Sequence, residues 1–254
     1  MMKKIFMAAV ALVVLAAAAS AAAHRGAAPE RAQERRALKG FERIEQQGSL
    51  NVKYQQGSTF SVLVKAPKSI IKNVQTRVEG NTLYVGMKGS NHVINFGWNK
   101  GGDVTVYVTS PDLIGIELKG SGDFECKQHL DTDILDITLR GSGDIDFHDI
   151  ICDKINVSVV GSGDVDIKKV ITQQSAIELV GSGDVEVSQQ QSKLTRIDLK
   201  GAGDITLNCK NCGKVVSCLQ GSGDITLTGD VTTHQSTKRG SGDVHTKNLV
   251  VRQR

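Results

Sequence analysis

Seven aspartates recur through the second half of the chain about 20 residues apart. They are Asp123, Asp144, Asp164, Asp184, Asp204, Asp224 and Asp243. In a stacked repeat, equivalent carboxylates would lie about 4.8 Å apart, the spacing between neighbouring strands. Such a row could bind calcium, which prefers oxygen ligands, or a carbohydrate, and the five candidate residues for this site are Asp144, Asp164, Asp184, Asp204 and Asp224. Alternatively, each carboxylate accepts backbone N–H bonds at its own corner. We favour this alternative because calcium-binding β-rolls use a shorter repeat.

Five cysteines are a second candidate for chemistry: Cys126, Cys152, Cys209, Cys212 and Cys218. In an exported protein, an odd count leaves at least one thiol unpaired or bonded to another chain. Cys209 and Cys212 have redox-motif spacing, but they follow a strand and do not open a helix, which argues against thioredoxin-like activity. Either Cys209 or Cys218 could bond to Cys212 as a loop staple. A single C-x-x-C is a weak zinc signal, so we expect no metal or cofactor.

The remaining acidic residues do not form a catalytic pattern. Asp146, Asp166 and Glu186 each follow a ladder aspartate by two residues and predict an acidic stripe that faces outward. Polysaccharide lyases and hydrolases instead gather unlike groups at one place, such as an acid and a base. No single repeat contains a distinctive cluster of His, Arg and carboxylate, so we expect a protein that is not an enzyme.

The aspartates belong to a longer repeat that must position them. The tetrapeptide Gly-Ser-Gly-Asp begins at Gly120, Gly141, Gly161, Gly181, Gly221 and Gly240, and Gly201-Ala202-Gly203-Asp204 fills the one gap. Glycine tolerates the positive φ that a tight corner needs, and Ser and Asp side chains can bond to nearby backbone. The tetrapeptide therefore predicts a corner in every repeat.

Alternating apolar residues flank each corner, as in Ile116 and Leu118 before the first one and Phe124 and Cys126 after it. This period-2 pattern indicates strands with one buried face. Units of about 20 residues cannot bury that face alone, whereas stacked units share a continuous core. We therefore predict an all-β protein, a right-handed parallel β-helix or β-solenoid with turns of about 20 residues.

The two ends of the repeat array differ from its middle. Residues 40–112 lack the motif but alternate well, and they predict an irregular β region that is continuous with the solenoid and caps its first turn. Within it, we expect 89–102 to be an exposed loop. The repeat solenoid spans 113–254, and its last turn carries His234, Ser236 and Lys238 where earlier copies have apolar residues. This substitution predicts a polar C-terminal cap.

Residues 1–23 have the features of a signal peptide, with Lys3 and Lys4 before an apolar run and small residues at the end. Residues 24–39 are basic, lack strand-like alternation and predict a linker. Together these two segments carry a net charge of +5, and the remainder sums to about −1, which gives the +4 of the whole chain. A near-neutral body argues against nucleic-acid binding. We expect an exported protein, periplasmic, outer-membrane-associated or secreted, with no transmembrane span in the mature chain.

The stretch from Val104 to Asp123, followed by the train of Gly-Ser-Gly-Asp turns, resembles the head GIN domain family of auto-transporter adhesins. The resemblance covers roughly 41–249. It implies secreted bacterial proteins with a β-helical fold, related in shape to pectin lyases, and it implies no established catalytic residues.

Three functions are consistent with these observations. The leading hypothesis is a non-catalytic β-solenoid of the cell envelope or the secreted fraction that binds or displays, with a glycan or cell-envelope protein as partner. The first alternative is a carbohydrate-active, pectin-lyase-like enzyme. The second is a periplasmic envelope structural or stress protein that acts through a protein partner. A localised cleft with perturbed carboxylates would favour the enzyme, whereas uniform ladders would favour the binding module.

Overall fold

The computed structural model describes residues 30–88 and 104–252. It divides into a short unit, Met1–Arg31, and a large unit, Ala32–Arg254, and the fold below is that of the large unit. The predicted signal peptide at 1–23 and the predicted loop at 89–102 lie outside the described residues.

Nearly all regular structure is β. The N-terminal region contains one 3₁₀ turn, η1 (Ile71–Asn73), and the strands β1 (Arg31–Arg36), β2 (Arg43–Gly48), β3 (Asn51–Gln56), β4 (Ser61–Pro67), β5 (Val74–Glu79), β6 (Thr82–Met87) and β7 (Thr105–Ser110). The repeat region contains β8 (Gly115–Gly120), β9 (Phe124–Asp131), β10 (Ile134–Gly141), β11 (Ile145–Gly161), β12 (Val165–Gly181), β13 (Asp184–Gln190), β14 (Leu194–Gly201), β15 (Asp204–Gly221), β16 (Ile225–Gly240) and β17 (Val244–Val251).

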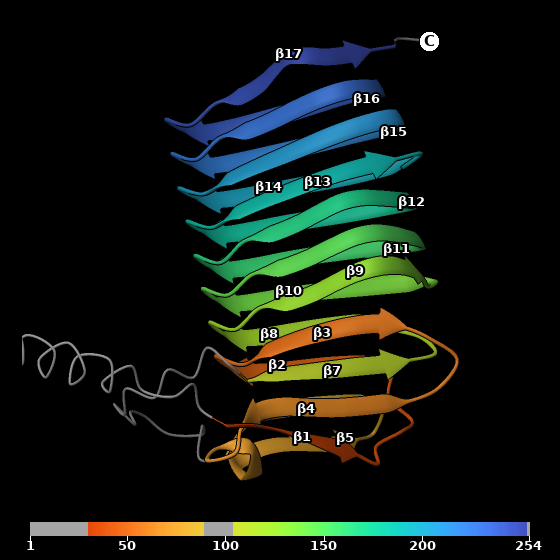
Figure 1. Cartoon of the computed structure of the whole chain (residues 1–254). Helices are drawn as coiled ribbons and strands as arrows, with labels where there is room; N and C mark the ends of the chain where they lie inside the picture. The colour runs from red at the N-terminus through yellow and green to blue at the C-terminus, as the bar shows by residue number, and fades with distance from the viewer. Residues whose placement is uncertain (1–29, 89–103, 253–254) are drawn as a thin grey trace, which may run out of the picture. The chain divides into compact units, whose positions relative to one another are not determined.

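The repeat strands stack in parallel, one turn above another (Figure 1). The strands that precede each Gly-Ser-Gly-Asp corner form one ladder. In it, β8 pairs with β10, and β10 pairs with the second half of β11. Strands after each corner form the other, which starts β9 and continues through the first half of β11. Glycines that open successive motifs are paired from Gly120↔Gly141 to Gly221↔Gly240. This register confirms the predicted parallel β-solenoid.

The N-terminal region extends both ladders below the first motif. Strand β2 pairs in parallel with β8 and β6, and β3 pairs in parallel with β9 and β7. The outermost pairs are antiparallel, with β4 on β7 and β5 on β6, and β1 pairs with β4. The irregular β region therefore caps the first turn, as predicted. Strand β1 was not expected, because 31–36 have no apolar alternation and only Ala32 packs against the core.

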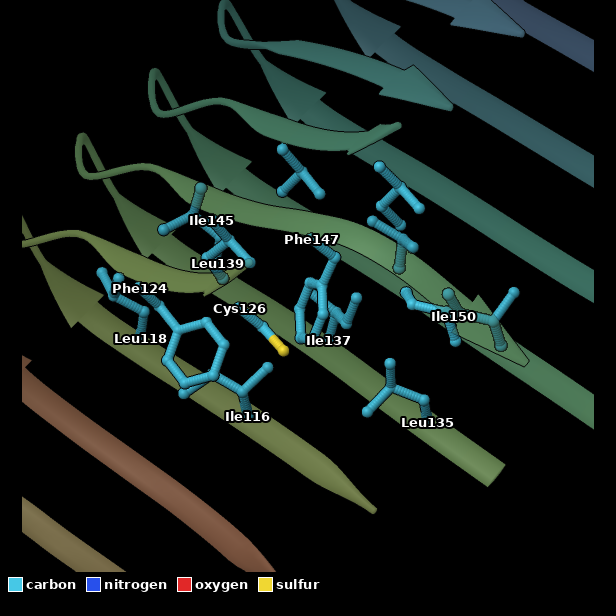
Figure 2. Close-up of a cluster of buried hydrophobic side chains, with 14 of the residues drawn as sticks. Ile116, Leu118, Phe124, Cys126, Leu135, Ile137, Leu139, Ile145, Phe147 and Ile150 are labelled. Atoms are coloured by element: carbon cyan, nitrogen blue, oxygen red, sulfur yellow. The ribbon is translucent and has the colours of Figure 1, made fainter. Parts of the chain in front are cut away.

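The core lies between the two ladders and runs the length of the stack. Figure 2 shows Leu118 and Leu139 from one ladder directed toward Phe124 and Ile145 from the other. All four are fully buried. The rings of Phe124 and Phe147 pack at a centroid distance of 5.4 Å, so aromatic side chains of successive turns also contact each other in the core. Burial of this apolar surface is the main stabilising contribution to the fold.

The last turn has lost its apolar inner side. His234, Ser236 and Lys238 pair with Val215, Ser217 and Leu219 of the turn below, and Ser236 and Lys238 are exposed. An apolar residue at these positions would present its surface to solvent at the open end of the stack. The polar residues therefore suit a terminal turn.

Candidate binding surface

The Gly-Ser-Gly-Asp tetrapeptides form one edge of the solenoid, which we call the glycine corner. The first glycine of each motif has positive φ, for example 137° at Gly161. A Cβ atom there would lie 2.2 Å from the carbonyl oxygen of Gly141 in the turn below. The second glycine has no unusual φ, but a Cβ on Gly163 would lie 2.1 Å from the oxygen of Gly143. Both glycines are required because neighbouring backbones approach so closely.

The aspartates of this corner connect successive turns. An Oδ1 atom of Asp164 accepts the backbone N–H of Asp184 at 2.8 Å, and Asp184 accepts that of Asp204 at 3.1 Å. The same bond joins Asp224 to Asp204 at 2.8 Å and Asp243 to Asp224 at 2.7 Å. Backbone bonding at the corner was expected, but the donor belongs to the next turn and not to the aspartate's own corner.

The electrostatic environment changes along this ladder. At Asp144, partial burial and the charges of Asp123 and Asp164 raise the carboxyl pKa. At Asp224, the N–H of Asp243 and the nearby imidazole of His245 lower it. Asp144, near the N-terminal end of the ladder, thus has repelling neighbours, whereas Asp224, near the C-terminal end, has a compensating partner.

Among residues 30–88 and 104–252, no three His, Cys, Asp or Glu side chains are grouped as metal ligands. One oxygen, Oδ1, of each of Asp164, Asp184, Asp204 and Asp224 already accepts a backbone N–H bond. The geometry of the ladder therefore supports a structural role for the five candidate aspartates, and their role as a calcium or carbohydrate site stays a prediction.

The outward acidic stripe is partly neutralised. In the register of the strands, Asp146 lies between Glu125 and Asp166, and these neighbours together with burial raise its pKa. Lysines supply the countercharge. Lys53 and Lys127 contact Glu125 at 2.8 and 2.6 Å, and Lys168 contacts Asp166. The stripe is therefore a polar face on which ion pairs with lysine partly neutralise the carboxylates.

The opposite edge, which we call the far corner, joins the two halves of each turn at 131–133, 151–154, 171–174, 191–193 and 211–213. Two surface hollows lie along it, of about 530 and 460 Å³. The first extends from Asp131 to Lys193 and the second from Gln191 to Arg252, and both are lined by Gln191 and Lys193. The two hollows adjoin at these shared residues, and we call the pair the trough.

Polar side chains along the trough form a hydrogen-bonded row. The amide nitrogen of Gln173 donates to Asp153 at 2.6 Å, and the ammonium of Lys193 donates to the amide oxygen of Gln173 at 2.9 Å. All three side chains are exposed. Asp131 and Asp133 lie at the N-terminal end of the trough, so its charge changes from acidic to basic along the solenoid axis.

The backbone at the trough is also unusual. Gln191 and Asn211 have φ values of 63° and 55°, and they are the only non-glycine residues with positive φ in the described chain. Asparagine tolerates this region better than glutamine does. Backbone in this region costs free energy and is found preferentially at functional sites.

This surface was not predicted from the sequence, although a signal for it existed. Asp133, Asp153, Gln173 and Lys193 follow one another at 20-residue intervals, but the residue type changes. A second missed element is a degenerate motif, Gly48-Ser49-Leu50-Asn51. Gly48 pairs with Gly120, and Asn51 accepts the N–H of Asp123 at 3.0 Å, as the ladder aspartates do. This segment forms the rung below the first recognised repeat.

The cysteines separate into two environments, and all five are free thiols in the structure. Cys126, Cys152, Cys209 and Cys212 are buried inside the solenoid. Cys218 is half-buried on the outer face of β15, where its sulfur accepts a bond from Gln220 at 3.7 Å. Cys209 and Cys212 both contact Gln189, whereas Cys218 points away from them.

No helix in the described part of the chain is long and apolar enough to cross a membrane. The fold and surface define a class of protein: a parallel β-solenoid whose polar side chains form ladders along its axis. The chain matches the family model described as "Putative auto-transporter adhesin, head GIN domain" over residues 40–215 and 165–253, and it belongs to this family. No curated protein matches the chain in sequence.

Solved structures have the same fold. A protein from Bacteroides fragilis described as a "putative adhesin" is 28% identical, with a TM-score of 0.75 over 88% of this chain and 98% of that one. A "putative adhesin" from Parabacteroides distasonis is 17% identical, with a TM-score of 0.70 over 87% and 98%. A "putative lipid binding protein" from Parabacteroides distasonis is 20% identical, with a TM-score of 0.63 over 87% and 97%. The last two show similarity of fold alone.

Proposed function

We propose that the protein is a non-catalytic, adhesin-like module that is exported and binds a carbohydrate chain along the far corner. Membership of an adhesin family supports a binding role outside the cytoplasm. The features of a signal peptide at 1–23 support export to the periplasm, the outer membrane surface or beyond. The observation that carries the choice of surface is the trough of two adjoining hollows that extends from Asp131 to Arg252.

The chemistry of the trough suits a chain of hydroxyl groups. Carboxylate oxygens of Asp153 can accept from sugar hydroxyls, and the ammonium of Lys193 can donate to them. Gln173 lies between them, and its side-chain amide can both donate hydrogen bonds to sugar hydroxyls and accept hydrogen bonds from them. Ile151, which is 38% exposed, provides apolar surface against which a sugar ring can pack. Successive turns each contribute one of these groups, so an extended ligand can contact several turns at once.

The arrangement gives less support to catalysis. The acid–base reactions of carbohydrate-active enzymes need an acid and a base held close to one bond of the substrate. In the trough, Asp153 and Lys193 are bridged by Gln173, so both are already engaged in hydrogen bonds. An envelope protein that binds another protein through the same trough is the remaining alternative.

Calorimetric titration with cello-oligosaccharides and with oligogalacturonate tests the proposal. We expect saturable binding without release of new reducing ends, and a loss of about tenfold in affinity in Asp153→Ala or Lys193→Ala, because each removes one hydrogen-bonding group. Asp184→Ala at the glycine corner is the matched control and should leave the affinity unchanged.

Cleavage of either oligosaccharide would overturn the non-catalytic assignment. Equal affinity in the wild type and both trough variants would overturn the assignment of the surface. Failure of both probes to bind would overturn the carbohydrate assignment and favour a protein partner.

A further inference from the structure

Part of the solenoid interior is polar, in the turns that run from β12 to β15. Gln189 is 1% exposed, and its side chain bonds to Ser175 at 2.7 Å and to Thr195 at 2.7 Å. Its Nε2 atom also lies 3.5 Å from the sulfur of Cys209. The hydrogen-bonded network thus extends over three successive turns and ends on a cysteine, while the equivalent positions beyond it hold apolar residues such as Ile155 and Val215.

A local bulge brings a second cysteine to the same place. In a regular strand, residues three apart point to opposite faces. On β15, however, the register passes from Cys209↔Gly229 to Cys212↔Val231, so one extra residue is present. Asn211, with φ of 55°, accommodates the turn. As a result, both sulfurs face the interior, and the sulfur of Cys212 lies 3.8 Å from the backbone oxygen of Gln189.

The two thiols share one neighbour, because the sulfurs of Cys209 and Cys212 both contact Gln189. A hydrogen bond between them, with Cys212 favoured as the thiolate, lowers the pKa of Cys212 to about 7 and raises that of Cys209. The isolated interior cysteines behave differently, since burial raises the pKa of both Cys126 and Cys152 to about 11.

Only one of the two thiols lies beside an opening to solvent. Cys212 lines the second hollow together with Lys193, Asn211 and Arg252, whereas Cys209 lies deeper, against Gln189. Burial of Cys212 to 2% exposure means that a small local opening of this corner must precede attack. A reagent that enters the hollow would therefore reach Cys212 before Cys209.

We propose that Cys209 and Cys212 are a disulfide-forming pair in which Cys212 reacts first, and that the oxidant is a disulfide compound entering through the far-corner hollow. The Cys212 thiolate attacks one sulfur of that disulfide, and the other sulfur leaves as a thiolate. Cys209 then attacks the Cys212 sulfur, giving its proton to the departing thiolate. The pair loses two electrons and two protons, and the oxidant becomes two thiols.

The test uses the folded full chain carrying Cys218→Ser, because the sulfur on the outer face would react independently. After incubation with oxidised glutathione, the protein is denatured, its thiols are labelled with a maleimide, and it is weighed by mass spectrometry. We expect two unlabelled cysteines, no glutathione adduct, and a peptide map that links Cys209 to Cys212.

Two further variants distinguish the order of attack, and each copies a residue already present at the equivalent position of another repeat. Cys209→Val reproduces Val170, two turns away in the same column, and should stop at one glutathione adduct on Cys212. Cys212→Ser reproduces Ser192, one repeat earlier, and should leave every remaining thiol labelled. Full labelling of the Cys218→Ser parent, or an adduct on Cys209 in Cys212→Ser, would overturn the proposal.

Discussion

At the glycine corner the repeats carry the same four residue types, with Ala202 as the one exception, whereas the far corner carries a different set in each repeat. The physical difference is space. Between Gly141 and Gly161 there is no room for a single Cβ atom, and the polar groups of the corner bond to one another. At the far corner Asp153, Gln173 and Lys193 extend into a trough.

The contrast between the two corners indicates where a solenoid can acquire a binding site. A corner whose backbones touch cannot change its residues without separating the turns, so its repeated aspartates are better explained by stability. A corner that leaves space can vary from turn to turn, so that the changing residues determine what binds. Repetition in the sequence therefore marks the structural edge, and variation marks the edge that can recognise a ligand.

Gly161→Ala should give the largest change and tests the tight corner. The new methyl group would meet the Gly141 oxygen, and φ of 137° is unfavourable for alanine. We expect a loss of about 3 kcal/mol in the free energy of unfolding, measured by urea denaturation. Ser162→Ala is the matched control, because the chain already has Ala202 at that position, and it should change stability by less than about 0.5 kcal/mol. Equal stability of the two variants would contradict the steric argument.

Asp184→Ala should give an intermediate change and tests the ladder. It removes the acceptor for the backbone N–H of Asp204, which we expect to cost about 1 kcal/mol in the same denaturation experiment. Asp184→Asn keeps a side-chain oxygen at the same place and should be nearly neutral. If the asparagine variant lost as much stability as the alanine variant, the negative charge would be the important property and not the hydrogen bond.

The smallest effects should be pH-dependent and opposite in sign within the ladder. The pKa of Asp144 is raised, so its protonated form favours the folded state, and that stabilisation is lost as pH rises through the folded pKa. Asp144→Asn should therefore be more stable than the wild type at neutral pH, with no difference in acid. The pKa of Asp224 is lowered, so its ionised form stabilises the fold at neutral pH and loses this effect as pH falls through the folded pKa.

Thermal unfolding from pH 3 to pH 7 compares these two variants. Asp224→Asn should be the less stable of the pair at neutral pH. Two asparagine variants that shifted the unfolding temperature in the same direction would show that the ladder has a uniform environment, contrary to the contacts of Asp123 and His245.

The parallel solenoid, its corners and its core could be predicted from the sequence because they rest on local patterns repeated many times. Alternation at Ile116 and Leu118 reappears in every turn, and each glycine meets the same neighbour one repeat away. Such regularity leaves one consistent arrangement. The sequence also predicted a corner role for the ladder aspartates, because Asp bonds readily to nearby backbone.

The missed features depend on which residues the stacking brings together. Gly48-Ser49-Leu50-Asn51 lies 72 residues before the first full motif and lacks its second glycine, so only the pairing of Gly48 with Gly120 reveals it as a rung. Strand β1 has no apolar alternation, and its pairing with β4 determines its structure.

By itself, therefore, the sequence determined the fold and the positions of its glycine corners, because a repeated local pattern can satisfy its neighbours in only one way. Tertiary structure alone decided the donor for each ladder aspartate, the trough from Asp131 to Arg252, and the meeting of Cys209 with Cys212. These depend on register, on a bulge and on the space left between turns, which are properties of the stacked backbone and not of any single repeat.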